Sequence, residues 1–159
     1  MRSLRVRFLR FLWFVPLLAT ALWCADPSLG TWRLNLQKST FRPGPAFQSE
    51  TRTYEEQKDG VKVTIRTVDA KGRQVTSVYL TTPDGEQHTV SGSGGPADSV
   101  ALKRIDDFTA ESTLIHAGKE IAKTTRVVSQ DGKTMTITYN GRDPEGNQVK
   151  YTLLFDQVK

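Results

Sequence analysis

Cysteine is absent from almost the whole chain, since its single cysteine is Cys24. Small exported domains commonly rely on disulfides, so a domain without them must draw its stability from a hydrophobic core. Histidine is also scarce, with His88 and His116 the two in the sequence. A zinc site without cysteine would need carboxylates from separate segments, so we expect no metal site.

Long hydrophobic runs are missing as well. The one apolar stretch extends from Phe11 to Trp23, and four arginines precede it. It is shorter than the roughly 18 apolar residues that a transmembrane helix needs, so we expect no membrane span in the mature chain. An arginine-rich start followed by a short apolar run is typical of a secretory signal peptide. We therefore expect residues 1–25 to be a cleavable signal and residues 26–159 to form a secreted or periplasmic domain.

The exact cleavage bond stays open. Small residues are preferred one and three places before a signal cleavage site, and a cut after Ala25 puts Trp23 in the third place. Cys24 also suggests a lipoprotein, whose lipid-bearing cysteine follows a small residue, but Trp23 occupies that place too. We expect a mature protein without lipid.

An excess of charge of one sign is missing from the expected mature domain. The whole chain has 22 Lys and Arg against 17 Asp and Glu, but four of the arginines and none of the acids precede Asp26. The remainder carries 18 against 17, so the sequence pI of about 9.5 largely reflects the first 25 residues. With neither a basic run nor a basic stripe, we expect no nucleic-acid partner.

Catalytic and cofactor motifs are also absent. The chain has no Gly-x-Ser-x-Gly, the turn that presents a nucleophile in many hydrolases. Its glycine-rich segment 91–95 lacks the Gly-Lys-Ser/Thr ending of a phosphate loop and precedes no predicted helix. We therefore expect neither an enzyme nor a bound cofactor.

What the sequence does contain is a series of short β-favouring runs separated by turns such as Asp59-Gly60 and Asp131-Gly132. Asp-Gly supplies the positive φ that tight hairpins need. Strands joined by short turns pair with their neighbours, and closure into a barrel removes the exposed edges. The sequence thus predicts an all-β, monomeric protein, a single antiparallel up-and-down meander of about ten strands closed into a barrel. The Pro- or Gly-rich segments 37–48 and 92–98 are expected to be surface loops.

Pairing the last four predicted strands indicates which side chains face inward. A loop of odd length at 143–147 sets Ile137 opposite Leu153 and Tyr139 opposite Tyr151. With a two-residue loop at Ala117-Gly118 and a three-residue loop at 130–132 as well, one face collects apolar residues. These are Phe108, Leu114, Ile121, Val127, Met135, Ile137, Leu153 and Phe155, while Arg126 falls on the other face. A two-residue Asp131-Gly132 turn would instead set Val128 opposite Met135 and shift one strand by a face.

Lys123 decides the candidate site in the first of these registers, where it points inward with Ser112, Tyr139 and Tyr151. An unpaired ammonium in an apolar interior costs several kcal/mol, so it needs a partner. Either the interior is wet or filled by a ligand, or Lys123 reaches the rim, or the register differs. From the first alternative we predict a ligand-binding site formed by these four residues, holding the anionic head of a fatty-acid-like molecule.

The opening Gly30-Thr31-Trp32-Arg33-Leu34 resembles the Gly-x-Trp start of the calycins, which include lipocalins, fatty-acid-binding proteins and avidins. With segments 38–45 and 126–135, the mature chain is similar to secreted bacterial lipocalin-like proteins. The resemblance implies a calycin barrel, a Trp32 that packs across its bottom, and a small apolar ligand. No binding residue carries over, because the last predicted strand lacks the Arg-x-Tyr of the fatty-acid-binding proteins and Trp32 is the only tryptophan after residue 25.

Two functions follow from these observations. The first is a secreted, non-enzymatic lipocalin-like protein that binds a small apolar or amphipathic molecule. The second is a structural or interaction module of the cell envelope with a filled core. A solvent-open cavity of several hundred Å³ would favour the first.

Overall fold

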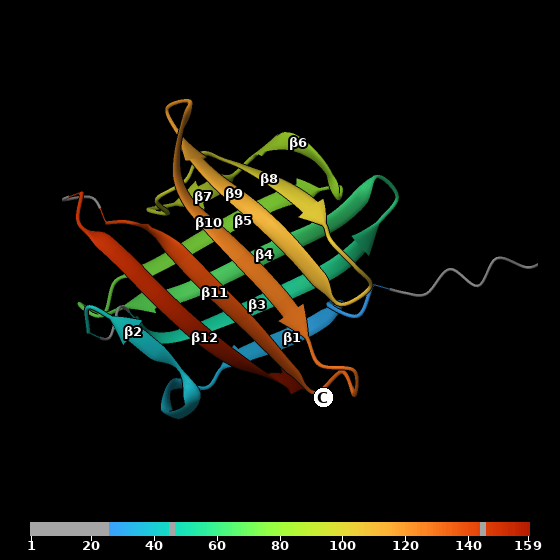
Figure 1. Ribbon diagram of the computed structural model, residues 1–159, viewed down its shortest axis with the longest axis horizontal. Helices are drawn as coiled ribbons and strands as arrows, with labels where there is room; N and C mark the ends of the chain where they lie inside the picture. The colour runs from blue at the N-terminus through green and yellow to red at the C-terminus, as the bar shows by residue number, and fades with distance from the viewer. Residues whose placement is uncertain (1–25, 45–46, 144–145) are drawn as a thin grey trace, which may run out of the picture.

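The computed structural model describes residues 26–44, 47–143 and 146–159 (Figure 1). The expected signal peptide lies outside these residues, so the division at residue 25 stays a prediction. Apart from the short 3-10 helix η1 (Leu36–Lys38), the regular structure described consists of strands. They are β1 (Gly30–Leu34), β2 (Thr40–Arg42), β3 (Phe47–Gln57), β4 (Gly60–Asp69), β5 (Gln74–Thr81), β6 (Asp84–Thr89), β7 (Ser91–Ser93), β8 (Ser99–Arg104), β9 (Thr109–His116), β10 (Lys119–Val128), β11 (Thr134–Arg142) and β12 (Gln148–Val158). Among the described residues, no helix has the length and apolar character that a membrane crossing requires.

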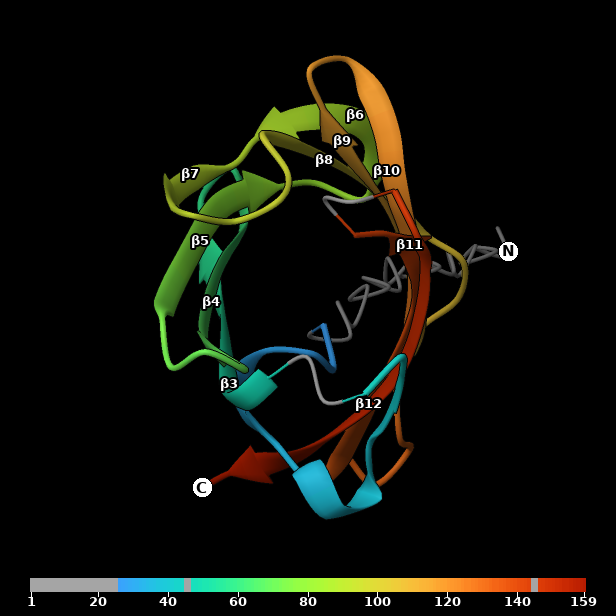
Figure 2. The same cartoon turned by 90° about the vertical axis from the view of Figure 1, so that its left-hand side faces the viewer.

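The strands form one antiparallel sheet in the order β6-β8-β9-β10-β11-β12-β1-β3-β4-β5-β7, with β2 beside β12. Strand β1 joins the first and last parts of the chain by pairing with both β3 and β12. Figure 2 shows the sheet curling round until its two edges approach each other. These edges are β6 and β7, which are successive along the chain, so this one segment pairs with β8 and then with β5. The expected antiparallel barrel is confirmed as a nearly closed barrel, with 12 strands in the described residues rather than about ten.

The two additional strands lie in segments that we expected to be loops. Strand β2 ends directly before Pro43 and pairs with β12, a place where a following proline interrupts no ladder. Strand β7 pairs with β5 around Gly92, whose φ is +131°. A Cβ at Gly92 would lie 1.9 Å from the carbonyl oxygen of Thr76, so only glycine lets the two strands approach this closely.

Strands β11 and β12 pair as predicted, with Ile137 opposite Leu153 and Tyr139 opposite Tyr151. Strands β9 and β10 begin as predicted, with His116 opposite Lys119. The register then shifts between Glu120 and Ala122, so that Ile121 is one extra residue on β10. A β-bulge of this kind turns every later side chain to the opposite face.

The bulge corrects our assignment of β10. Lys123 lies opposite Thr113 instead of Ser112, and Val128 lies opposite Met135, as in the alternative register. Val127 is consequently 42 % exposed instead of buried, and Arg126 faces the interior that we had assigned to Lys123. The prediction of an inward Lys123 is therefore wrong.

The barrel has two ends, which we name after a residue of each. The Trp32 end holds the turns at 57–60, 104–109 and 128–134, and the Tyr151 end holds those at 69–74, 116–119 and 142–148. The buried core extends from the Trp32 end towards the middle. Its members are Trp32, Leu34, Tyr54, Val63, Val128, Met135, Ile137, Leu153 and Phe155. Trp32 is fully buried, as the resemblance implied.

Candidate functional site

A cavity of about 1010 Å³ occupies the inside of the barrel. Protein pockets for small molecules commonly have volumes of roughly 300–1,000 Å³, so this space is large enough for a small-molecule ligand. Its apolar wall comes from strands on all sides of the barrel. Representative members are Val63, Ile65, Val75, Val100, Leu102, Leu114, Ile121, Ile137 and Leu153. The interior is therefore open, which favours a binding protein over a filled-core module.

Glu50 and Arg52 place a buried ion pair on the wall formed by β3. The Arg52 Nε donates to Glu50 Oε1 at 2.6 Å, and the Thr67 hydroxyl donates to Glu50 Oε2 at 3.1 Å. Burial alone would lower the pKa of Arg52, but the Glu50 carboxylate beside it holds this pKa above its ordinary value. Both carboxylate oxygens and the guanidinium Nε are thus engaged within the protein.

Two tyrosines stand beside this pair. The guanidinium of Arg126 lies over the ring of Tyr54, with its central carbon 5.0 Å from the ring centroid. Burial, and secondarily the nearby Tyr54, raise the pKa of Tyr79. Tyr79 therefore keeps its proton at neutral pH, and its hydroxyl is available to a bound molecule as a hydrogen-bond donor.

Arg126 is a buried charged group of the cavity wall whose hydrogen-bond donors are not all satisfied. In the described part of the chain, its Nε is the one buried side-chain nitrogen or oxygen without a hydrogen-bond partner. Its nearest anionic group is Asp26, whose Oδ2 lies 3.9 Å from Nη2, too far for a hydrogen bond. The side chain is 14 % exposed, so water satisfies little of it. A buried guanidinium with free donors is a strong site for an anion.

The other four arginines that line the cavity, among the residues described, are engaged. Arg52 pairs with Glu50, and Arg73 donates from Nε to Asp69 Oδ2 at 2.7 Å. Arg104 donates to the backbone oxygens of the 106–107 turn, at 3.1 and 3.2 Å. Arg142 donates to the backbone oxygen of residue 146 at 2.8 Å. Arg126 differs from these four arginines because its buried Nε has no hydrogen-bond partner.

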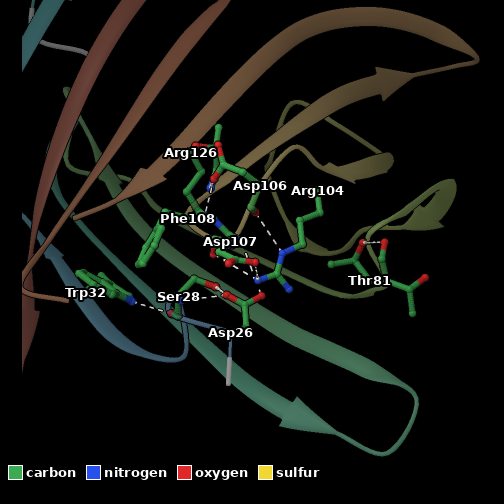
Figure 3. A network of polar contacts seen from close by, with 11 residues as sticks. Asp26, Ser28, Trp32, Thr81, Arg104, Asp106, Asp107, Phe108 and Arg126 are labelled. Atoms are coloured by element: carbon green, nitrogen blue, oxygen red, sulfur yellow. Dashed lines mark hydrogen bonds and ion pairs between the residues drawn. The ribbon is translucent and has the colours of Figure 1, made fainter. Parts of the chain in front are cut away.

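A short polar chain leads from Arg126 to the buried tryptophan, as Figure 3 shows. Oδ1 of Asp26 accepts hydrogen bonds from the Ser28 N–H at 2.9 Å and from the Ser28 hydroxyl at 2.7 Å. The backbone oxygen of Ser28 in turn accepts from the Trp32 indole N–H at 2.8 Å. Ser28 and Trp32 are both fully buried, so this chain fixes the position of the Asp26 carboxylate.

Three of the four site residues predicted from sequence line the cavity together. Ser112, Tyr139 and Tyr151 all face it, and their role in ligand binding stays a prediction. Thr124 takes the place predicted for Lys123, because it lies opposite both Ser112 and Tyr139. The Lys123 side chain is 67 % exposed, with its Nζ 3.7 Å from a Glu120 carboxylate oxygen.

The Tyr151 end carries a cluster of partly exposed aromatic rings. Tyr139 and Tyr151 stack with centroids 5.4 Å apart, and Phe41 and Phe47 contact Tyr151 at 5.5 and 5.9 Å. Strand β2 brings Phe41 to this place by pairing with β12. Burial raises the pKa of Tyr139, and the neighbouring Tyr151 adds to the effect.

A scan of protein-family models finds no match, and a search of curated proteins by sequence finds none either. Among solved structures, the chain is similar to zebrafish ileal bile acid-binding protein complexed with cholic acid. The TM-score is 0.49 with 10 % sequence identity, over 83 % of this chain and 99 % of that one. The assignment of a barrel rests on the strand pairing of the chain itself.

Sequence reasoning missed Glu50, Arg52 and Arg126. Strand β3 alternates Glu50, Arg52 and Tyr54 with Thr51 and Thr53, and composition alone favours the uncharged threonines as the inner face. The available signal was the pairing partner, because Tyr54 lies opposite Val63 of an apolar β4 face. The prediction that Arg126 lies on the outer face is also wrong, since Arg126 faces inward.

No group of three or more His, Cys, Asp or Glu side chains in the described ranges is placed to hold a metal ion. His88 lies near Thr82, with 3.2 Å between its Nε2 and the Thr82 hydroxyl, and near Asp84 at 3.6 Å. His116 Nδ1 lies 3.4 Å from a carboxylate oxygen of Asp98.

Proposed function

We propose that the protein is a non-enzymatic carrier that binds a small amphipathic molecule inside the barrel. The apolar body of the molecule occupies the middle of the cavity, and its anionic head contacts Arg126. The observation that carries this proposal is the buried Arg126 Nε without a hydrogen-bond partner, at the wall of a cavity of about 1010 Å³.

The chemistry of the wall selects the ligand class. A carboxylate or sulfonate offers two oxygens to the Nε and Nη donors of Arg126, and hydrogen bonds to charged groups are the stronger kind. The protonated hydroxyl of Tyr79 supplies a further donor from β5. Arg52 cannot replace Arg126, because Glu50 already accepts its Nε hydrogen. The apolar wall then supports an alkyl chain or a ring system of matching volume.

The test is calorimetric titration of the purified protein with dodecanoate and, as an uncharged match, dodecanol. Arg126→Met keeps much of the apolar stem and removes the charge, so it should lower the affinity for dodecanoate by about 1.5–3 kcal/mol. Arg104→Met is the matched control, since Arg104 also lines the cavity but its donors are taken by a turn. Equal losses in both variants would remove Arg126 from the site, and a wild type that binds neither molecule would support the interaction module instead.

We further propose that the protein acts after export, as a monomer without lipid. The arginine-rich start and short apolar run of residues 1–25 support export, and Trp23 argues against lipid attachment at Cys24. Intact mass of protein recovered from its native host tests both points, and sedimentation tests the monomer. A retained Met1 or an added diacylglyceryl mass would overturn the proposal.

A further inference from the structure

The carboxylate of Asp26 lies close to Arg126 but beyond hydrogen-bond distance. Asp26 directs Oδ2 at Arg126 Nη2 from 3.9 Å, so it offsets the charge without using any of the N–H donors. Its other oxygen is held by two hydrogen bonds from Ser28. The carboxylate is thus fixed next to the guanidinium but does not bind it.

The segment that carries Asp26 is firmly attached to the barrel. Trp32, which is fully buried, donates its indole N–H to Ser28, and the Leu29 N–H donates to the Asp26 backbone oxygen at 3.0 Å. Asp26 also lines the cavity, as Arg126 does. A ligand anion that binds Arg126 therefore lies close to the Asp26 carboxylate. Two negative charges this close together repel strongly in a partly buried site.

We infer that the Asp26 carboxylate competes with anionic ligands for Arg126 and lowers their affinity. An anionic ligand therefore needs an apolar part of a minimum length in order to bind. This inference rests on the proposed function, since it assumes that the anionic head binds at Arg126. A short anion gains too little from the cavity wall to overcome the competition. A long amphipathic anion gains about fourfold in affinity for each methylene group that it buries, and binds.

Asp26→Asn tests the inference because the amide keeps an oxygen for the Ser28 donors and loses the charge. In calorimetric titrations, this variant should bind dodecanoate more tightly than the wild type, by about 5- to 150-fold, the usual range for coupling between two sites. It should also bind octanoate measurably, where the wild type does not. The affinity for uncharged dodecanol should stay unchanged.

Asp107→Asn is the matched control. Asp107 lines the same end of the cavity, and its substitution by asparagine removes the same charge. The Asp107 carboxylate, however, lies 3.7 Å from Arg104, and its side chain is 80 % exposed. This variant should bind dodecanoate as the wild type does. In an Arg126→Met background, Asp26→Asn should give no gain, because the charge for which it competes is gone.

Thermal unfolding of each variant separates folding from binding, and Asp26→Ser serves as a second variant should Asp26→Asn unfold. Two results would overturn the inference while leaving the proposed function intact: a wild type that binds dodecanoate with both Asp26 variants no tighter, or a gain that persists without Arg126. Failure of the wild type to bind either dodecanoate or dodecanol would instead reject the proposed function.

Discussion

The two ends of the barrel hold their aromatic side chains by different means. Trp32 is fully buried, and its indole N–H is bonded to the backbone of Ser28. At the opposite end, Phe41, Phe47 and Tyr151 contact one another ring to ring at 5.5–5.9 Å and stay partly exposed. A hydrogen bond fixes a side chain in one geometry, whereas ring contacts tolerate displacement.

This difference suggests that the two ends of the barrel have different roles in ligand binding. The Trp32 end has the rigid polar network and the free guanidinium, so it is suited to close the barrel and hold a charged head. The Tyr151 end has partly exposed aromatic rings without a hydrogen bond like that of Trp32, and the short strand β2 beside them, so we expect ligands to enter there. Variants at each end test this division, and we take them from the largest expected effect to the smallest.

Trp32→Ala should lower the free energy of unfolding by about 3–5 kcal/mol, as large-to-small changes of buried aromatics do. The loss combines a cavity in the core with an unpaired oxygen on Ser28. Phe41→Ala at the other end should cost clearly less, because its ring is partly exposed and makes no hydrogen bond. Urea denaturation measures both, and equal midpoints would contradict the division between the ends.

Gly92→Ala should lower the free energy of unfolding by about 1–3 kcal/mol, the range for overpacking a closely packed site. Its Cβ would lie 1.9 Å from the Thr76 carbonyl oxygen, where β7 pairs with β5 at one edge of the nearly closed barrel. Gly94→Ala is the control, because Gly94 also has a positive φ but its nearest neighbour would be 3.7 Å away. Equal losses would show that backbone strain, and not strand contact, sets the cost at Gly92.

Much of the fold was predictable because it depends on local signals. Every one of the expected strands is present, and the β11–β12 pairing follows directly from its turn. Strand β2 escaped notice because three residues beside a proline carry too little pattern. Strand β7 was not predicted because Gly92 and the glycines after it are typical of a loop.

The site was less predictable because it depends on one residue of register. Nothing in the local sequence marks Ile121 as a bulge, since the strand continues to favour β structure on both sides. The expected polar cluster was nevertheless nearly right, because Ser112, Tyr139 and Tyr151 lie on strands before and after the shift. The cationic residue that faces the interior is Arg126 and not Lys123.

Tyr151→Leu should lower the free energy of unfolding by about 0.5–1.5 kcal/mol, the energy of aromatic pairs beyond their buried area. It removes the stacking with Tyr139 and opens the aromatic cluster. If ligands enter at this end, the association and dissociation rates of a fluorescent fatty acid should both change more than its affinity. Stopped-flow measurement decides this, and unchanged rates would move the entrance away from the Tyr151 end.

Lys123→Met should have the smallest effect, although the sequence alone gave this residue the central role. Its side chain is 67 % exposed and makes one long ion pair with Glu120, so the loss of stability should stay within about 0.5 kcal/mol. The affinity for dodecanoate should equal that of the wild type. Thr124→Met is the paired variant, because its neighbour Thr124 lines the cavity and a larger side chain there should alter the affinity. A Lys123→Met variant that loses as much affinity as Arg126→Met would mean that the bulge at Ile121 is absent in solution and that Lys123 faces inward.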